Sequence, residues 1–190
     1  MRDTPLELPL PDYLHAVRGG ILRRDHGKAK GRIGARGFAG DYASDILGYC
    51  AEVHVSRATG LAHNGVNAEA DPDLADVGEC LQVRATRYPD GRLPVYLDAR
   101  PGDWYVLAVG HGRRMWIRGA MLAAEAMSYP AFALRAGFAE SHNVPQAHLH
   151  AIIGPDGTRY PASGLEDRPP LVVAVSVTLA VTPAVTVANA

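Results

Sequence analysis

The sequence is short of cysteine and of net charge, and each shortage excludes a class of protein. Its two cysteines, Cys50 and Cys80, are too few for a disulfide framework or a four-cysteine zinc site. We therefore expect both thiols to be reduced, as in a cytoplasmic protein. The formal net charge is -1, so no overall basic field indicates a nucleic-acid-binding protein, and charge has to be assessed locally.

Several common catalytic motifs are also absent from the sequence. The chain has no Gly-x-x-x-x-Gly-Lys-Ser/Thr run and no Gly-x-Ser-x-Gly, which argues against a P-loop NTPase and an α/β-hydrolase. The glycine-rich stretch from Gly31 to Gly40 follows no clear strand, which argues against a dinucleotide-binding fold. Acidic residues and prolines interrupt the start of the chain, so we expect no export signal.

What is present is a chain of 190 residues, enough for one domain with a substantial core. We predict a basic, flexible arm over residues 1–33 and an α/β core over residues 34–150. Residues 151–190 are predicted to form a linker and a β-rich, apolar extension. The basic cluster in and next to the arm, which is either solvated or in contact with phosphate, consists of Arg23, Arg24, Lys28, Lys30, Arg32 and Arg36.

Apolar spacing and glycine positions predict the helices. The predicted helices are Tyr13–Leu22, Phe38–Leu47 and Gly119–Met127. We expect the first to end near Gly19 or Gly20 and the second to stop at Gly48. The stretch from Asp25 to Gly37 lacks apolar periodicity and is typical of a loop.

Alternating apolar residues predict the strands. The predicted strands are Ala51–Ser56, Glu79–Arg87, Leu93–Leu97, Trp104–Val109 and Met115–Arg118. A turn at Tyr88-Pro-Asp-Gly-Arg92 predicts that the second and third strands form a hairpin. The nearly continuous apolar run of the fourth is typical of a central strand. Together these elements predict an α/β fold with a central mixed β-sheet flanked by helices.

The end of the chain has a composition of its own. No charged residue occurs from Leu171 to Ala190, and Val, Ser and Thr alternate through much of this stretch. A membrane span needs ~20 strongly apolar residues, and Ser, Thr and Pro183 dilute this one. We therefore expect no membrane association and favour an extra strand or an extended tail over a membrane anchor. Such a tail could pair with a protein partner or with a second copy.

The stretch from Asp76 to Thr86 is the strongest candidate for a functional site. It places an acidic residue just before a β-type run in which Gln82 and Arg84 share one face, because residues two apart in a strand point the same way. A carboxylate, a second oxygen ligand and a fixed cation would then converge beside one strand. That set is the minimum needed to hold a divalent metal ion against a phosphodiester.

Two further segments extend this pattern to a family resemblance. The segment Gly40-Asp-Tyr-Ala-Ser-Asp-Ile-Leu-Gly48 resembles the Gly-Glu-x-Ala-x-x-x-Leu-Gly opening helix of small PD-(D/E)XK nuclease-like proteins, many of them phage-encoded. The Asp76-Val-Gly and Gln82-Val-Arg84 segments, followed by the strand Trp104–Val109, are similar to the rest of that core.

The resemblance covers roughly Gly34 to Met127 and implies a restriction-endonuclease-like core that hydrolyses DNA phosphodiesters with Mg²⁺ or Mn²⁺. It implies that Asp76 is the principal metal ligand, with Asp41 as a second or water-mediated ligand and Gln82 as a third oxygen. The metal would polarise the phosphate and lower the pKa of its bound water. Arg84 would hold a non-bridging oxygen and stabilise the developing charge.

Three positions depart from the family pattern. Asp41 stands in place of Glu, Gln82 is a neutral amide, and Arg84 replaces a Lys that could help to activate water. These departures leave open a protein that binds DNA with reduced or absent cleavage.

Two alternatives come from other parts of the chain. His148 and His150 would lie on one face of a strand, with His142 nearby, as ligands for zinc or another transition metal. Ile152 occupies the place of a further histidine in the alternating-histidine motif of histidine-triad nucleotide hydrolases, and surface histidines are the simpler interpretation. The second alternative is a non-enzymatic phage accessory or structural protein that pairs with a partner through residues 171–190.

Overall fold

The computed structural model describes residues 4–30, 41–65, 74–133, 139–160 and 169–173. Its helices are α1 (Leu10–Ala29), α2 (Tyr42–Thr59) and α3 (Ala123–Ala126), with a 3₁₀ turn at Gln146–His148. The longer strands are β2 (Leu81–Thr86), β3 (Leu93–Tyr96), β4 (Trp104–His111), β5 (Arg114–Leu122) and β7 (Ser141–Val144). The two-residue strands are β1 (Leu6–Glu7), β6 (Ala131–Phe132), β8 (Ile152–Ile153), β9 (Arg159–Tyr160) and β10 (Leu171–Val172).

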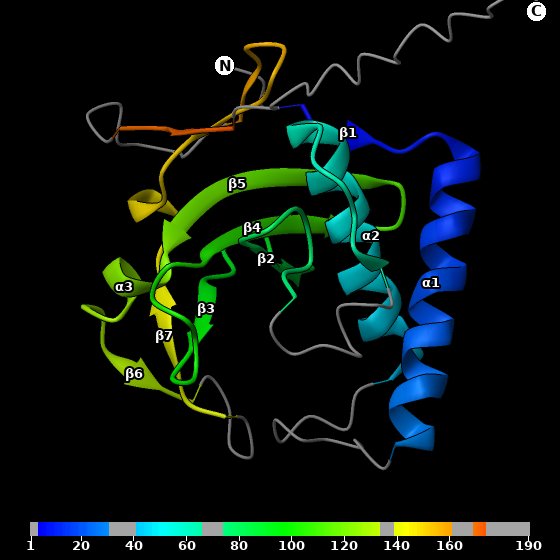
Figure 1. The fold of residues 1–190 in the computed structure, drawn as a ribbon, viewed down its shortest axis with the longest axis horizontal. Helices are drawn as coiled ribbons and strands as arrows, with labels where there is room; N and C mark the ends of the chain where they lie inside the picture. The colour runs from blue at the N-terminus through cyan, green and yellow to red at the C-terminus, as the bar shows by residue number, and fades with distance from the viewer. Residues whose placement is uncertain (1–3, 31–40, 66–73, 134–138, 161–168, 174–190) are drawn as a thin grey trace, which may run out of the picture.

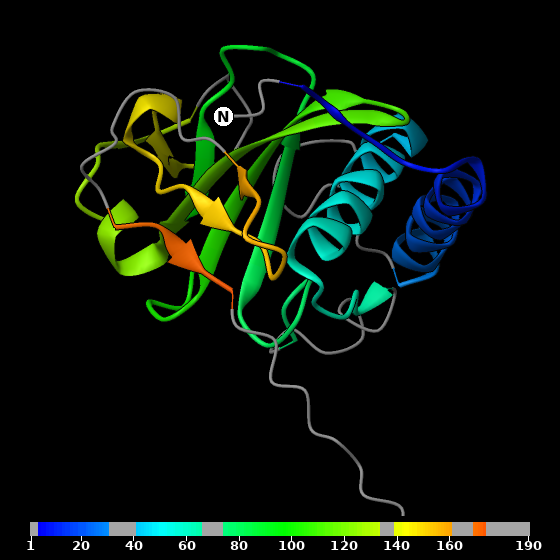
Figure 2. The same cartoon turned by 90° about the horizontal axis from the view of Figure 1, so that it is seen from above.

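The centre of the fold is a mixed sheet with the strand order β1-β5-β4-β2. In this sheet β2 runs parallel to β4, and β5 runs antiparallel to β4. Helix α2 covers one face, and α1 lies outside α2 (Figures 1 and 2). The opposite face carries a second sheet of order β3-β7-β6, and a third small sheet has the order β10-β8-β9. The mixed α/β class is therefore confirmed.

Strand β4 separates two cores, and alternate residues of this strand belong to each. Val106 and Ala108 point into the core beneath α2, whereas Leu107 and Val109 point into the core beneath β3 and β7. All four are buried, as expected of a central strand with both faces covered. The prediction of a buried central strand at Trp104–Val109 is confirmed.

Helix α1 continues well beyond the glycines where we expected it to end. A Cβ on Gly19 would lie 2.2 Å from the Tyr49 ring, and a Cβ on Gly20 would lie 2.5 Å from the Ile46 backbone. These glycines therefore allow α1 to pack closely on α2, and they do not stop the helix. The prediction of a flexible arm is wrong for Leu10–Ala29, while Lys30 caps the helix and residues 31–40 lie outside the described residues.

Helix α2 extends through the stretch that we predicted as the strand Ala51–Ser56. Every residue from Tyr49 to Val55 is buried, because α2 lies between α1 and the sheet. A segment buried on all sides shows no helical amphipathicity, so its local alternation was misleading. The helix ends at Gly60, which adopts φ 69°, a left-handed conformation that glycine adopts without strain. Gly48 therefore lies inside α2 and does not end the helix.

Strands β2 and β3 exist as predicted, but they do not form a hairpin. The turn after β2 is present, with the Gly91 backbone N–H donating to the Tyr88 carbonyl. The chain then leaves the main sheet, and β3 pairs antiparallel with β7, with Leu93 opposite Val144. Strand β2 pairs with β4 instead of β3. Strand β4 is apolar on both faces, as a central strand requires, whereas β3 is apolar on one face.

Two later segments also differ from expectation. The predicted helix Gly119–Met127 is mostly the end of β5, and only Ala123–Ala126 is helical. The predicted long C-terminal strand is represented by β10, and residues 174–190 lie outside the described residues. Among the described residues, both cysteines are unpaired, and no helix has the length and apolarity needed to cross a membrane.

Candidate active site

Asp76 lies at the outer edge of the main sheet, just before edge strand β2. Its Oδ2 atom accepts a hydrogen bond of 2.7 Å from the Val83 backbone N–H and lies 3.6 Å from Nη1 of Arg84. The side chain of Asp76 is 17% exposed, so this carboxylate is mostly buried but still reaches solvent. The predicted proximity of Asp76 and Arg84 is present in the structure.

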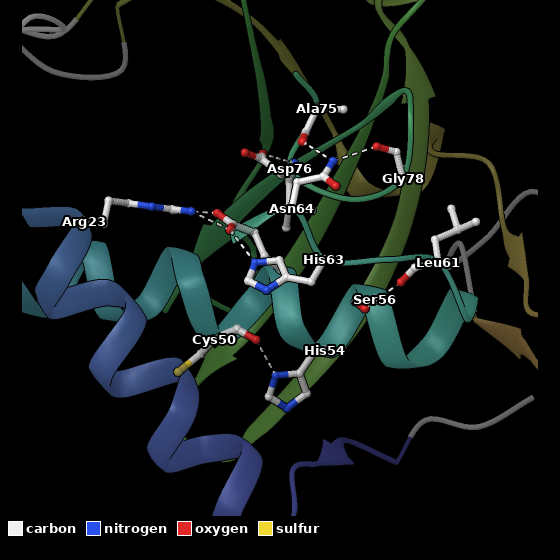
Figure 3. A network of polar contacts seen from close by, with 12 residues as sticks. Arg23, Cys50, His54, Ser56, Leu61, His63, Asn64, Ala75, Asp76 and Gly78 are labelled. Carbon is white, nitrogen blue, oxygen red and sulfur yellow. Dashed lines mark hydrogen bonds and ion pairs between the residues drawn. The ribbon is translucent and has the colours of Figure 1, made fainter. Parts of the chain in front are cut away.

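Glu52 of α2 is a second carboxylate whose charge acts on Asp76. Its side chain is only 4% exposed, and both of its oxygens accept hydrogen bonds of 2.6 Å from the guanidinium of Arg23 on α1. His63 Nε2 donates to Oε2 of Glu52 at 3.0 Å. In Figure 3 dashed lines join Arg23 and His63 to the carboxylate between them, and Asp76 is labelled above this group. We call Glu52 and Asp76 the acid pair.

Tyr49, one turn before Glu52 in α2, supports the two groups that hold this glutamate. The Arg23 guanidinium carbon lies 4.9 Å from the centroid of the Tyr49 ring, and the His63 ring meets that ring edge-on at 4.6 Å. The absence of a side chain at Gly19 gives this ring its space. The sequence therefore positions the site through the close packing of α1 on α2.

The loop that carries Asp76 is held to the same region by Asn64. The Asn64 side-chain amide donates hydrogen bonds of 2.7 Å to the carbonyls of Ala75 and Gly78, on either side of Asp76 (Figure 3). The Asn64 backbone N–H also donates to the Asp76 carbonyl. Asn64 therefore satisfies three carbonyl groups of this turn and holds it in position.

The surroundings shift the pKa values of the acid pair in opposite directions. Burial raises the pKa of Asp76, and the charge of Glu52 raises it further, against the opposing effect of Arg84. Burial also acts to raise the pKa of Glu52, but the charges and hydrogen bonds of Arg23 and His63 outweigh it, so that pKa lies below its usual range. Neighbouring carboxyls whose pKa values diverge are typical of functional sites.

The structure places the other three predicted site residues as follows. Asp41 is the N-cap of α2, fully exposed, and its carboxylate accepts the Ser44 backbone N–H at 2.7 Å. The Gln82 amide contacts Oδ2 of Asp103 at 3.4 Å. No contact joins Asp41 or Gln82 to Asp76 among the described residues, and the acid whose charge acts most on Asp76 is Glu52.

Arg84 lies against two aromatic rings on the face of β2 that points away from α2. Its guanidinium carbon lies 4.8 Å from the Tyr105 ring centroid and 5.6 Å from that of Tyr96. Nη1 donates to the Val83 carbonyl at 2.8 Å, so the cation is fixed beside the Asp76 carboxylate. A guanidinium restrained in this way loses little conformational entropy when it binds an anion.

The capacity of the site for a metal ion is limited to the acid pair. Within the described ranges, no three His, Cys, Asp or Glu side chains are grouped so that they could hold a metal ion. Mg²⁺, however, is commonly bound by one or two carboxylates, with water and substrate phosphate as its other ligands. Glu52 and Asp76 are carboxylates of that kind. No contact among the described residues joins Asp41, Asp76 and Gln82, the metal ligands that we predicted.

Each of the three C-terminal histidines contacts other groups of the protein, and two of them contact Tyr129. His142 Nδ1 contacts the Tyr129 carbonyl at 2.7 Å, and His148 Nδ1 contacts the Tyr129 hydroxyl at 3.1 Å. His150 lies against Glu125 and the Pro169 carbonyl. The predicted strand at His148-Leu-His150 is wrong, because a 3₁₀ turn ends at His148 and His150 forms an isolated bridge with Ala120.

Sequence reasoning missed Glu52, Arg23 and His63. Glu52 lies in a predicted strand, and Arg23 lies in the basic cluster that we expect to be either solvated or in contact with phosphate. One signal was available: a Glu in an apolar run on α2 and an Arg in the preceding helix require partners once both are buried. Their pairing depends on the contact between α1 and α2, which spacing along the chain does not reveal.

Comparison with known proteins identified no relative of this chain. The chain matches no protein-family model, no curated protein and no solved structure.

Proposed function

We propose that this protein is a metal-dependent phosphodiesterase acting on nucleic acid, with a restriction-endonuclease-like core. The observation that carries the proposal is the contact of Asp76 with Arg84, in which a largely buried carboxylate before β2 lies 3.6 Å from a cation that rests on two aromatic rings. The charge of Glu52 on α2 acts on the same carboxylate. The order of these elements, a helix with an acid and then an Asp before a strand with an Arg, supports the resemblance to PD-(D/E)XK nuclease-like proteins.

The residues of the site have distinct roles in this proposal. Glu52 and Asp76 would hold the divalent cation, which lowers the pKa of a bound water and polarises the phosphate when it is present. Arg84 binds a non-bridging phosphate oxygen and stabilises the negative charge that develops there. Tyr96 and Tyr105 keep its guanidinium in place. DNA remains the favoured substrate.

Cleavage of plasmid and oligonucleotide DNA with Mg²⁺ or Mn²⁺ tests the proposal. Asp76→Asn and Glu52→Gln should each reduce cleavage on the order of a hundredfold, as when an electrostatic group is removed from an active site. Asp45→Asn is the matched control, because Asp45 is a half-buried acid on the same helix that faces Arg24. Equal activity of all three variants and the wild type would exclude the acid pair as the site.

A second function, binding of DNA without cleavage, is favoured by one observation. Both oxygens of Glu52 are already bonded to Arg23, and one is also bonded to His63. A protein in which this arrangement is permanent would lack a metal site and would keep Arg84 as a cation for a phosphate group. It would bind DNA with an affinity that falls as salt rises, and no metal would induce cleavage.

A further inference from the structure

Strand β2 is an edge strand of the main sheet, and part of its outer edge is covered by the chain itself. Among the described residues the sheet has the order β1-β5-β4-β2, so β4 pairs with only one side of β2. At the start of the strand, Val77 and Leu81 exchange two backbone hydrogen bonds, of 3.0 and 3.2 Å. Open N–H and C=O groups on such an edge can pair with another chain, so proteins usually cover them.

Two side chains cover the next outward-facing residue of β2, which is Val83. Oδ2 of Asp76 accepts the Val83 N–H at 2.7 Å, and Nη1 of Arg84 donates to the Val83 carbonyl at 2.8 Å. The two covering atoms lie 3.6 Å from each other. In an antiparallel sheet, one residue of a neighbouring strand would supply the same acceptor and the same donor to Val83. We call Asp76 and Arg84 the edge cap.

Both members of the edge cap are held in place by other parts of the fold. Asn64 bonds to the turn on either side of Asp76, and the Arg84 guanidinium rests on the rings of Tyr96 and Tyr105. The side chains of the edge cap are 17% and 19% exposed. A carboxylate and a guanidinium restrained in this way keep the backbone groups of β2 occupied at little further cost in conformational entropy.

We propose that the edge cap has a function of its own, which is to keep a second copy of this chain from adding to the main sheet through β2. This inference goes beyond the proposed function and requires neither a metal ion nor a substrate. It assigns to Asp76 and Arg84 the task of replacing a neighbouring strand at the one residue where both bonds are made by side chains.

The partner that β2 fits is its own counterpart in an antiparallel pair. With Ala85 opposite the Ala85 of the second copy, Val83 would lie opposite Arg87 because the positions run in opposite directions. On the other face Arg84 would lie opposite Thr86, so no like charges would face each other. This register uses the two backbone groups of Val83, which the edge cap occupies, and leaves the bonds of Leu81 intact.

Sedimentation velocity over a wide range of protein concentration tests the proposal on the full chain. Asp76→Ala should dimerise roughly tenfold more tightly than the wild type, because the Val83 N–H loses its acceptor and a second copy can supply one. Asp76→Asn should behave as the wild type, because its amide oxygen still accepts this N–H. Asp90→Ala is the matched control, since it removes an exposed acid in the turn after β2 without touching the edge cap.

Charge changes at Thr86 test the register in the Asp76→Ala protein. Thr86→Glu would face Arg84 of the second copy and should tighten the dimer, whereas Thr86→Lys should weaken it. Association that both substitutions leave unchanged would show that β2 does not pair in this way and would overturn the proposal.

Arg84→Met provides a second opening of the edge if Asp76→Ala does not fold. It keeps an apolar side chain against the two tyrosine rings and removes the donor to the Val83 carbonyl, so it should also dimerise more tightly than the wild type. Equal association of the wild type, Asp76→Ala and Arg84→Met would overturn the proposal. So would dimerisation of Asp76→Asn to the extent of Asp76→Ala, because the lost charge and not the lost hydrogen bond would then be the cause. The proposed function is tested separately, by cleavage with Asp76→Asn.

Discussion

The helix-covered face of the main sheet buries charged side chains, whereas the face beneath β3 and β7 is packed mainly with aliphatic residues. On the first face, Glu52 and Arg23 form a buried pair inside the layer of α1 and α2. On the second, Leu107 and Val109 of β4 pack against Leu93 and Val95 of β3. A buried ion pair seldom adds more stability than apolar residues of the same volume. We therefore infer that function, rather than stability, explains why charged residues are buried on this face.

Removal of Arg23 should produce the largest loss of stability on the charged face. Arg23→Ala leaves Glu52 buried with His63 as its remaining partner, and breaking a buried pair in this way costs about 3–5 kcal/mol. Arg24→Ala should cost about 1 kcal/mol or less, because its partner Asp45 is looser and more exposed. Urea unfolding of both variants measures the difference, and equal losses would show that the Arg23 pair has no special role in the fold.

A cavity on the apolar face should lower stability without changing the acid pair. Leu107 is fully buried in the core beneath β3 and β7, and Leu107→Ala should cost about 2–4 kcal/mol through lost burial and the cavity left behind. The Mn²⁺ affinity of the folded variant should equal that of the wild type. A change in metal affinity would show that the two faces are coupled through β4.

Two glycines of α1 differ in how closely they pack, and alanine substitutions at them test the contact between α1 and α2. Gly19→Ala forces a Cβ against the Tyr49 ring and should cost about 1–3 kcal/mol as an overpacked contact. A Cβ on Gly27 meets nothing within 4 Å, so Gly27→Ala should gain about 0.5–1 kcal/mol from helix propensity. Thermal unfolding checks both signs, and a stabilising Gly19→Ala would contradict the close approach of α1 to α2.

The smallest expected effect is the pH dependence of the acid pair. The lowered pKa of Glu52 contributes stability that is present above its ordinary pKa of about 4.3 and is lost as the pH falls through the lowered value. The raised pKa of Asp76 has the opposite sign, because its contribution is lost as the pH rises through the raised value. Relative to the wild type, Glu52→Gln should therefore gain stability as the pH falls, and Asp76→Asn should gain stability as it rises.

Unfolding free energies measured from about pH 3 to 7 would test these two slopes. Asp45→Asn is again a useful control, since burial raises the pKa of Asp45 away from the acid pair. Slopes of the same sign for Glu52→Gln and Asp76→Asn would show that the two carboxyls do not occupy different environments.

Much of the sheet was predictable from the sequence, because its strands carry the pattern of their burial. The continuous apolar run of β4 and the alternation of β2 identified both strands within a few residues. The closeness of Asp76 and Arg84 followed from the same alternation. Gly19 and Gly48 misled the prediction, since a glycine that permits close packing and one that ends a helix look the same in a sequence.

The sequence by itself determined the strands β2, β3 and β4, the turn after β2 and the acid before β2, since these depend on residues close together in the chain. The tertiary structure decided which strand lies beside β2 and which acid lies beside Asp76. Glu52 reaches that place because α1 and α2 pack closely through Gly19, and Arg23 and His63 then hold its charge in a buried position. Contacts between distant segments select their partners by shape and charge, which spacing along the chain does not encode.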